Sequence, residues 1–184
     1  MKFFKKSELK IIFVILLSIS FLYVINIKAS LRKGRDITRK DDISYVQKAL
    51  NTYYQKHKVY PLSDNSGRIL GCFNDAPLFD EKTGFAINAV ACDWGRSSFE
   101  DITLMPRDPK SKDGMEYKYV SDGSSYKFYV SLEGKKEPEY NEQTISLNLQ
   151  CGTKICNYGR GDKELKIEFY FLKTDKKLLH LSSF

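Results

Sequence analysis

An uninterrupted apolar run near the N-terminus constrains the fold of this chain most strongly. Residues 11–27 have the sequence IIFVILLSISFLYVINI, seventeen residues without a charge, flanked by Lys10 and Lys28. A helix of that length covers about 25 Å, and flanking lysines that reach toward the interface extend it to about the thickness of the bilayer hydrocarbon. The run therefore predicts a transmembrane helix over residues 11–27, preceded by a basic flank over residues 1–10.

A cleaved secretory signal is the alternative explanation of this run. The run is longer than the usual apolar core of a signal, and Ile27-Lys28-Ala29 is a poor small-x-small cleavage site. We therefore predict a retained single-pass anchor in contact with membrane lipid.

The positive charge of the chain gathers around the anchor. The net charge is +7, but residues 41–184 hold 20 basic and 21 acidic side chains, so the head itself is nearly balanced. This distribution argues against general phosphate binding by the head. Five basic residues follow the anchor and could contact anionic lipid headgroups, which we favour, or nucleic acid, which is the weaker alternative. They are Arg32, Lys33, Arg35, Arg39 and Lys40.

The helix is predicted to continue beyond the membrane as an amphipathic segment over residues 28–58. This segment contains no proline, and only Gly34 lowers its helix propensity. Apolar residues recur at spacings of three and four, which is the pattern of one buried helix face. The predicted packing face consists of Ile43, Val46, Leu50, Tyr53 and His57. Pro61 ends the helix, so the prediction is one helix of about 50 residues and about 75 Å.

The sequence period changes to two in the later part of the chain, which is typical of strands. The alternating segments Glu116–Val120 and Tyr126–Leu132 flank an Asp122-Gly123 pair, which predicts a hairpin. Two more candidate strands are Thr144–Leu149 and Glu164–Leu172. The predicted class is α+β, in which the helical face covers a small antiparallel sheet within a head over residues 59–184.

The connector Leu62–Met105 is rich in Gly, Asp and Asn. A stretch of this length without regular structure needs short helices or a disulfide to organise it. Ser98 with Asp101 could cap one short helix before Pro106.

Four cysteines follow the anchor: Cys72, Cys92, Cys151 and Cys156. Neither a Cys-x-x-Cys motif nor a nearby histidine supports a zinc site. We expect two disulfides outside the cytoplasm, with Cys72–Cys92 and Cys151–Cys156 as the local pairing among three connectivities. Four buried thiols are the alternative.

Catalytic and metal motifs are weak. His57 and His180 are the only histidines, and no nucleophile elbow, zinc-protease motif or phosphate loop accompanies them. Residues 108–114 faintly resemble a calcium loop, but Lys110 and Lys112 stand where oxygen ligands are needed. The prediction is therefore a protein that is not an enzyme and uses no cofactor and no metal.

Two segments of the chain are similar to type IV pilins and type II secretion pseudopilins. The first runs from Gly34 to Ile43 and on through Gln47, Ala49-Leu50, Tyr53-Tyr54 and Tyr60-Pro61, similar to the family's passage from the anchor helix into its Tyr-Pro loop. The second comprises Leu104–Pro109, Tyr117-x-Tyr119 and Asp122-Gly123-x-x-Tyr126, which resemble the family's Pro-x-Asp-Pro turn and first hairpin.

This resemblance implies a pilin-like fold and a function without catalysis. It implies a single-pass protein of the bacterial cytoplasmic membrane, with its C-terminal head extracytoplasmic. Subunits would associate with one another, or with other pilin-like subunits, through their N-terminal helices in a surface filament, secretion or DNA-uptake apparatus. The alternatives are a monomeric, anchored, extracytoplasmic binding domain and, ranked lower, an extracytoplasmic enzyme.

The start of the chain departs from the family pattern. The first glycine is Gly34, beyond the apolar run, and the only early acid, Glu8, precedes the run. The prepilin cleavage motif is thus absent or diverged, and we expect the chain to remain uncut as a membrane anchor.

Overall fold

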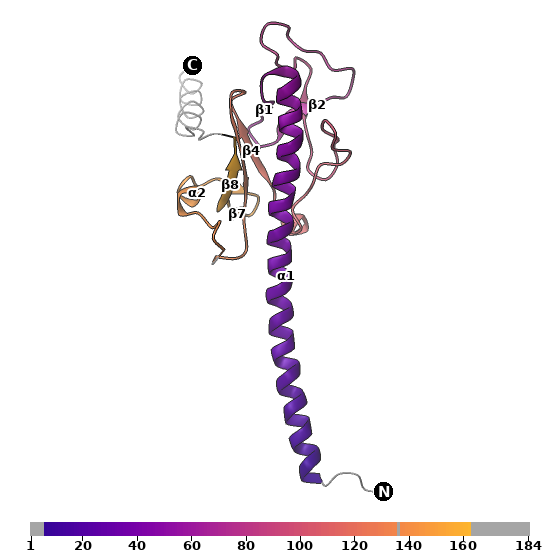
Figure 1. The fold of residues 1–184 in the computed structure, drawn as a ribbon, viewed down its shortest axis with the longest axis vertical. Coiled ribbons are helices and arrows are strands. Elements are labelled where there is room, and N and C mark those ends of the chain that lie inside the picture. Colours follow the sequence, from indigo (N-terminus) through magenta and orange to yellow (C-terminus); the bar gives the residue numbers. More distant parts are fainter. Residues whose placement is uncertain (1–5, 136, 163–184) are drawn as a thin grey trace, which may run out of the picture.

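The fold is organised around one long helix. The computed structural model describes residues 6–135 and 137–162. Helix α1 spans Lys6–His57, 52 residues, or about 78 Å at 1.5 Å per residue. The other elements surround the C-terminal half of α1, while its N-terminal half extends beyond them (Figure 1). The helix ends where Lys58 adopts a left-handed φ of 62°. The predicted α+β class is therefore confirmed.

The buried face of α1 forms one wall of the main core. Ile43, Val46, Leu50 and Tyr53 are at most 1% exposed. His57, at the end of the same face, is only partly buried and stacks on Phe79, with ring centroids 3.9 Å apart. Core aromatics from the rest of the chain join this face: Tyr60, Phe99, Tyr117, Tyr119, Tyr126 and Phe128.

The main sheet has the order β4-β5-β8, and its pairs are antiparallel. Its strands are β4 (Lys118–Ser121), β5 (Tyr126–Val130) and β8 (Tyr158–Gly161). The predicted hairpin joins β4 to β5, with Ser121 paired to Tyr126. Asp122 Oδ1 accepts hydrogen bonds from the backbone N–H groups of Ser124 and Ser125, at 2.9 and 2.8 Å, and thereby fixes the turn.

Both faces of this sheet are buried, whereas the alternation predicted strands with one solvated face. Phe128 and Val130 belong to the main core. Tyr129 and Val120 belong to a second cluster, completed by Leu149, Cys151 and Cys156. The segment that contains Leu149, Cys151 and Cys156 therefore covers the side of the sheet opposite α1.

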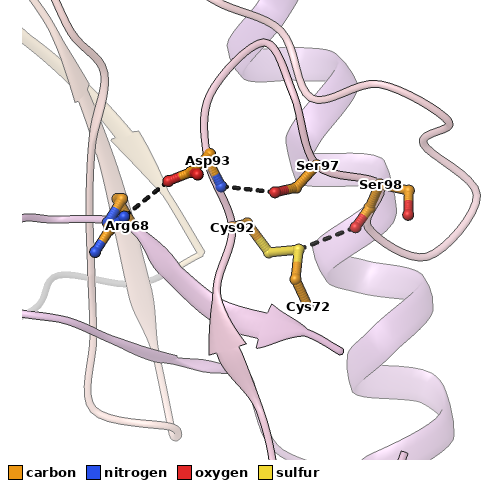
Figure 2. Close-up of a disulfide and its surroundings, with 6 residues drawn as sticks. All are labelled: Arg68, Cys72, Cys92, Asp93, Ser97 and Ser98. Atoms are coloured by element: carbon orange, nitrogen blue, oxygen red, sulfur yellow. Dashed lines mark hydrogen bonds and ion pairs between the residues drawn. A yellow bond between two sulfur atoms is a disulfide. The ribbon is translucent and has the colours of Figure 1, made fainter. Parts of the chain in front are cut away.

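The predicted irregular connector contains a second antiparallel sheet, of order β1-β2-β3. Its strands are β1 (Leu62–Ser63), β2 (Ile69–Cys72) and β3 (Val90–Ala91). A disulfide joins Cys72 to Cys92, with a Cα–Cα distance of 5.2 Å (Figure 2). It links the end of β2 to the residue after β3 and closes the connector into a compact unit.

The short helix that Ser98 and Asp101 could cap before Pro106 is not formed. Phe99 and Ile102 instead exchange two backbone hydrogen bonds, of 2.9 and 2.8 Å, across a tight turn in which Glu100 has a φ of 51°. Both side chains are at most 2% exposed. Burial of both apolar side chains in the core therefore prevails over the capping pattern.

The predicted strand Thr144–Leu149 is also wrong. Helix α2 spans Glu142–Ser146, and Asn141 Oδ1 caps it by accepting from the N–H groups of Gln143 and Thr144. The cap satisfies backbone donors that a strand would have to pair elsewhere. The hairpin of β6 (Gln150–Cys151) and β7 (Lys154–Ile155) follows, beside the Cys151–Cys156 disulfide. The predicted strand Glu164–Leu172 and His180 lie outside the described residues.

Candidate assembly site: the apolar helix and its charged junction

The N-terminal half of α1 is apolar and uncovered. An 18-residue window of this helix has a mean hydropathy of 2.3, and none of the window is buried against the part of the head that the structure describes. Phe13 and Phe21 are 64% and 69% exposed. Water disfavours such a surface, whereas lipid or neighbouring apolar helices would cover it. By length and composition, this is one helix able to cross a membrane.

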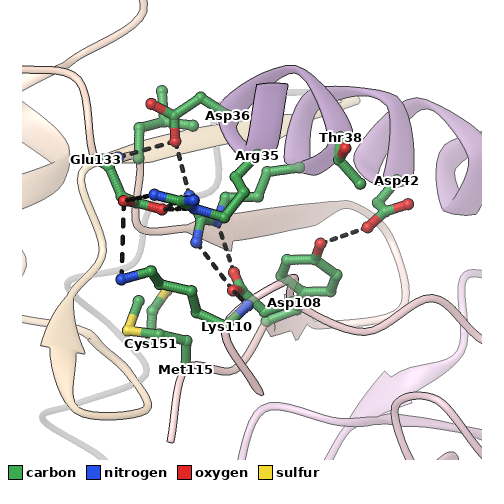
Figure 3. Close-up of polar contacts among 12 residues, drawn as sticks. Arg35, Asp36, Thr38, Asp42, Asp108, Lys110, Met115, Glu133 and Cys151 are labelled. Atoms are coloured by element: carbon green, nitrogen blue, oxygen red, sulfur yellow. Dashed lines mark hydrogen bonds and ion pairs between the residues drawn. The ribbon is translucent and has the colours of Figure 1, made fainter. Parts of the chain in front are cut away.

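A buried arginine marks the point where α1 enters the head. The side chain of Arg39 is fully buried and forms a bidentate pair with Asp108: Nε lies 2.7 Å from Oδ2, and Nη2 lies 2.9 Å from Oδ1. Figure 3 shows Asp108 together with Asp36 and Glu133 on the same side of α1. Asp108 precedes the short 3-10 helix Ser111–Asp113. The pair therefore joins α1 to a segment 69 residues away in the sequence.

Two further carboxylates complete the surroundings of Arg39. Its Nη1 donates to Asp36 Oδ1 at 2.7 Å and to Glu133 Oε1 at 3.0 Å. Asp36 also accepts from the backbone N–H groups of Glu133 and Gly134, both at 2.9 Å. Arg35 forms a second bidentate pair with Glu133, at 2.7 and 2.6 Å. We refer to Arg35, Asp36, Arg39, Asp108 and Glu133 as the charged junction.

The charged junction shifts the pKa values of Arg39 and Glu133. Burial disfavours the charge of Arg39, but the hydrogen bonds that it donates to Asp108, Glu133 and Asp36 outweigh burial and raise its pKa. Hydrogen bonding from Arg35, reinforced by Arg39, lowers the pKa of Glu133 to about 2. A buried charge held by several partners is strongly destabilised when one partner is lost. The charged junction therefore fixes the orientation of helix α1 relative to the rest of the head.

Two more contacts extend the attachment along α1. Lys40 Nζ lies 2.8 Å from Glu139 Oε1 and 3.6 Å from a Glu137 oxygen. The Tyr117 hydroxyl donates to the Asp42 carboxylate, while burial of that carboxylate raises its pKa. Polar contacts thus continue onto the part of α1 where the apolar core face begins.

The charged junction predicts a specific acid sensitivity. The folded-state pKa of Glu133 is about 2, against an ordinary value of 4.5. A depressed carboxyl pKa stabilises the fold above the ordinary value, and this contribution disappears as the pH falls from about 4.5 to about 2. We therefore expect the wild type to lose more unfolding free energy than Glu133→Gln across that window. Urea unfolding at several pH values measures the difference.

Asp42 has a raised pKa and so acts in the opposite direction. Because it is present in both proteins, the difference between their pH profiles isolates Glu133. Parallel pH profiles for the two proteins would contradict the assigned role of Glu133.

The structure changes the interpretation of the basic residues after the anchor. Arg35, Arg39 and Lys40 bind carboxylates of the head rather than standing free for lipid or nucleic acid. Arg32 and Lys33 are exposed, and neither forms an ion pair with another described residue. Only these two of the five side chains are available for headgroup contact.

Asp36 and Arg39 also lie on the buried face of α1, but the sequence analysis did not assign them to it. They continue the spacing of Ile43, Val46 and Leu50 toward the N-terminus by three- and four-residue steps. Oppositely charged residues on an otherwise apolar helical face were the available signal. Their partners Asp108 and Glu133 could not be found in this way, because they are distant in sequence.

His57 and the calcium-like loop, the other candidate sites, make contacts that stabilise the fold. His57 stacks on Phe79 and meets the tilted ring of Tyr53, and burial lowers its pKa. Asp108, the first residue of the faint calcium-like loop, has both carboxylate oxygens bound to Arg39. Within residues 6–135 and 137–162, no group of three or more His, Cys, Asp or Glu side chains could hold a metal ion.

No protein-family model matches this chain, and neither a curated protein nor a solved structure matches it. The functional proposal below therefore rests on the geometry of the helix and of its attachment to the head.

Proposed function

We propose that this protein is a non-enzymatic, membrane-anchored, pilin-like subunit that assembles through its N-terminal helix. The observation that carries the proposal is the division of α1 into two halves. Its apolar N-terminal half has no cover from the described residues of the head, while its C-terminal half is the spine of the core. A rigid rod of this kind can pack against other rods and hold its head at a fixed height above the membrane.

The two disulfides support an extracytoplasmic head. Cys72–Cys92 and Cys151–Cys156 are formed, and the described residues include no free cysteine. Disulfides persist in oxidising compartments and are rare in the cytosol. We therefore place the head outside the cytoplasmic membrane.

Packing between rods within the lipid would depend on shape and on a few polar groups. Ser18 donates its hydroxyl hydrogen to the Val14 carbonyl within the same helix, at 2.9 Å. Ser20 and Asn26 are exposed polar side chains in the apolar half. Small and polar residues favour close helix contacts in membranes. Ser18 and Asn26 lie less than a quarter turn apart around the helix, so we assign the assembly face to the side of α1 that carries these two residues.

Disulfide crosslinking in membranes tests the proposal. Because the described cysteines are all paired, a cysteine introduced at Val14, Ile15, Leu16 or Leu17 supplies a single reactive thiol, and these four consecutive exposed positions sample all sides of the helix. We expect oxidation to join neighbouring subunits efficiently at some of these positions and weakly at others, since a packed helix presents one face. Dilution into excess detergent micelles before oxidation is the control for collisions.

A uniform and low yield at every position, equal to the yield after dilution, would contradict assembly. That result would favour the monomeric, anchored binding domain instead. The binding domain is the second candidate because the head contains a groove lined by Arg96, Arg107 and Trp94.

A further inference from the structure

A groove of about 600 Å³ lies on the head, away from the apolar helix. This volume falls within the range of small-ligand sites. Its walls come from the segments around residues 66–68, 93–96, 107–112 and 115–117. The charged and aromatic side chains of the lining include Arg68, Trp94, Arg96, Arg107, Lys112 and Glu116.

The groove carries an excess of unpaired positive charge. Arg96, Arg107 and Lys112 are exposed, and none of them forms an ion pair with any other residue that the structure describes. The acids Asp93 and Asp108 are already bound, because Arg68 lies 2.7 Å from Asp93 (Figure 2) and Arg39 holds Asp108. Glu116 remains as an exposed acid in the lining. The three cations therefore exceed the available negative charge, which favours an oxyanion as ligand.

Backbone contacts hold the two arginines of the rim together. The N–H of Gly95 donates to the Met105 carbonyl at 2.9 Å, and the N–H of Met105 donates to the Ser97 carbonyl at 2.8 Å. The stem of Arg107 lies against the bare backbone of Gly95, where an added Cβ would come 2.8 Å from the Arg107 Cδ. Arg96 and Arg107 thus belong to two segments that are joined by backbone hydrogen bonds, and both residues line the rim of the groove.

One aromatic ring supplies the apolar surface of the groove. Trp94 is partly buried and meets Tyr117 and Phe128 edge to face, at centroid distances of 5.9 and 5.4 Å. Tyr117 also lines the groove but is only 1% exposed. Single-stranded nucleic acid is usually bound on a series of exposed rings. A single indole beside several cations instead suits one sugar ring with an oxyanion next to it.

We propose that this groove binds an anionic carbohydrate, in which the sugar ring packs on Trp94 and its phosphate or carboxylate group pairs with Arg96 and Arg107. The planar guanidinium groups bind either oxyanion through two parallel hydrogen bonds. Lys112, which also lines the groove, adds a point charge. This binding site is separate from the apolar half of α1.

The single tryptophan of the chain makes the groove directly observable. Fluorescence of the full-length protein in detergent micelles is titrated with a phosphorylated mannan oligosaccharide and, separately, with an oligogalacturonate. The two arms distinguish phosphate from carboxylate as the anion. We expect a saturable change in Trp94 emission with at least one of them, and binding weaker by about tenfold or more for the neutral mannan oligosaccharide.

Variants then assign the binding to the rim. Arg96→Gln with Arg107→Gln is expected to weaken binding of the anionic probe by about tenfold or more. The matched control, Lys48→Gln with Lys82→Gln, removes two exposed cations outside the groove and should leave affinity unchanged. Near-ultraviolet circular dichroism confirms that both variants keep the native fold.

Three results would overturn the proposal. They are the absence of a saturable change with both anionic carbohydrates, equal weakening by the control and rim variants, and tighter binding of an oligothymidylate or a polyglutamate peptide than of either carbohydrate. The last result would assign the groove to nucleic acid or to acidic protein. Saturable binding that is lost only in the rim variant would support it.

Discussion

Replacing Arg39 with methionine is expected to lower the free energy of unfolding of the head by about 3–5 kcal/mol. Methionine retains much of the apolar volume but leaves the buried Asp108 and Asp36 carboxylates without their shared cation. Uncompensated charge in a buried site is among the largest single-residue effects known in proteins. Urea unfolding of the full-length protein in micelles, followed by Trp94 fluorescence, measures the loss.

Two matched variants make this prediction specific. Arg32→Met removes an exposed arginine without an ion-pair partner among the described residues, and it should change stability by less than about 0.5 kcal/mol. Arg35→Met removes a partner of Glu133. Because the Arg35 side chain is 29% exposed, the loss of unfolding free energy should lie between those of Arg32→Met and Arg39→Met. A loss from Arg39→Met no larger than that from Arg32→Met would show that the charged junction does not hold the rod to the head.

Removal of the Cys72–Cys92 disulfide is expected to have the second largest effect. The two cysteines are 20 residues apart, and the chain-entropy model assigns a loop of that length about 3 kcal/mol. The same model assigns about 2 kcal/mol to Cys151–Cys156, which closes a loop of 5 residues. We therefore expect Cys72→Ala with Cys92→Ala to destabilise the head more than Cys151→Ala with Cys156→Ala.

Denaturant midpoints of the two double variants test this order. Cys92, Cys151 and Cys156 are all fully buried, so lost side-chain packing is similar at the two sites and the loop length dominates the difference. If removal of Cys151–Cys156 lowered the unfolding free energy as much as removal of Cys72–Cys92, or more, the β1-β2-β3 sheet would keep its fold without the Cys72–Cys92 disulfide.

The long helix and the first hairpin could be predicted because their signals are local. The apolar run and the three- and four-residue spacing of Ile43, Val46, Leu50 and Tyr53 directly specify a helix and its buried side. Asp122-Gly123 between two alternating segments specifies the turn between β4 and β5. These features need no knowledge of distant parts of the chain.

The charged junction could not be predicted because its contacts are distant in sequence. Arg39 meets Asp108 and Glu133 across 69 and 94 residues. By itself, an arginine after a membrane anchor resembles a headgroup contact. Its position on the buried face becomes informative only when Asp36 and Arg39 are counted together with the apolar residues that follow them.

Short elements account for the remaining errors. Strands β1 and β3 contain two residues each, too few to show a period. Helix α2 contains five residues, and the Asn141 cap determines it more than the alternation of the following residues does. In these segments, capping and tertiary burial prevail over sequence pattern.

We propose that one unbroken helix serves both as membrane anchor and as spine of the head. Double electron–electron resonance between spin labels at Phe13→Cys and Asn51→Cys, in lipid nanodiscs, tests it directly. The two positions are 38 residues apart within α1, so a continuous helix predicts one narrow distribution near about 57 Å. A broad distribution, or one centred well below that distance, would show that the rod bends or breaks between membrane and head and would contradict the account.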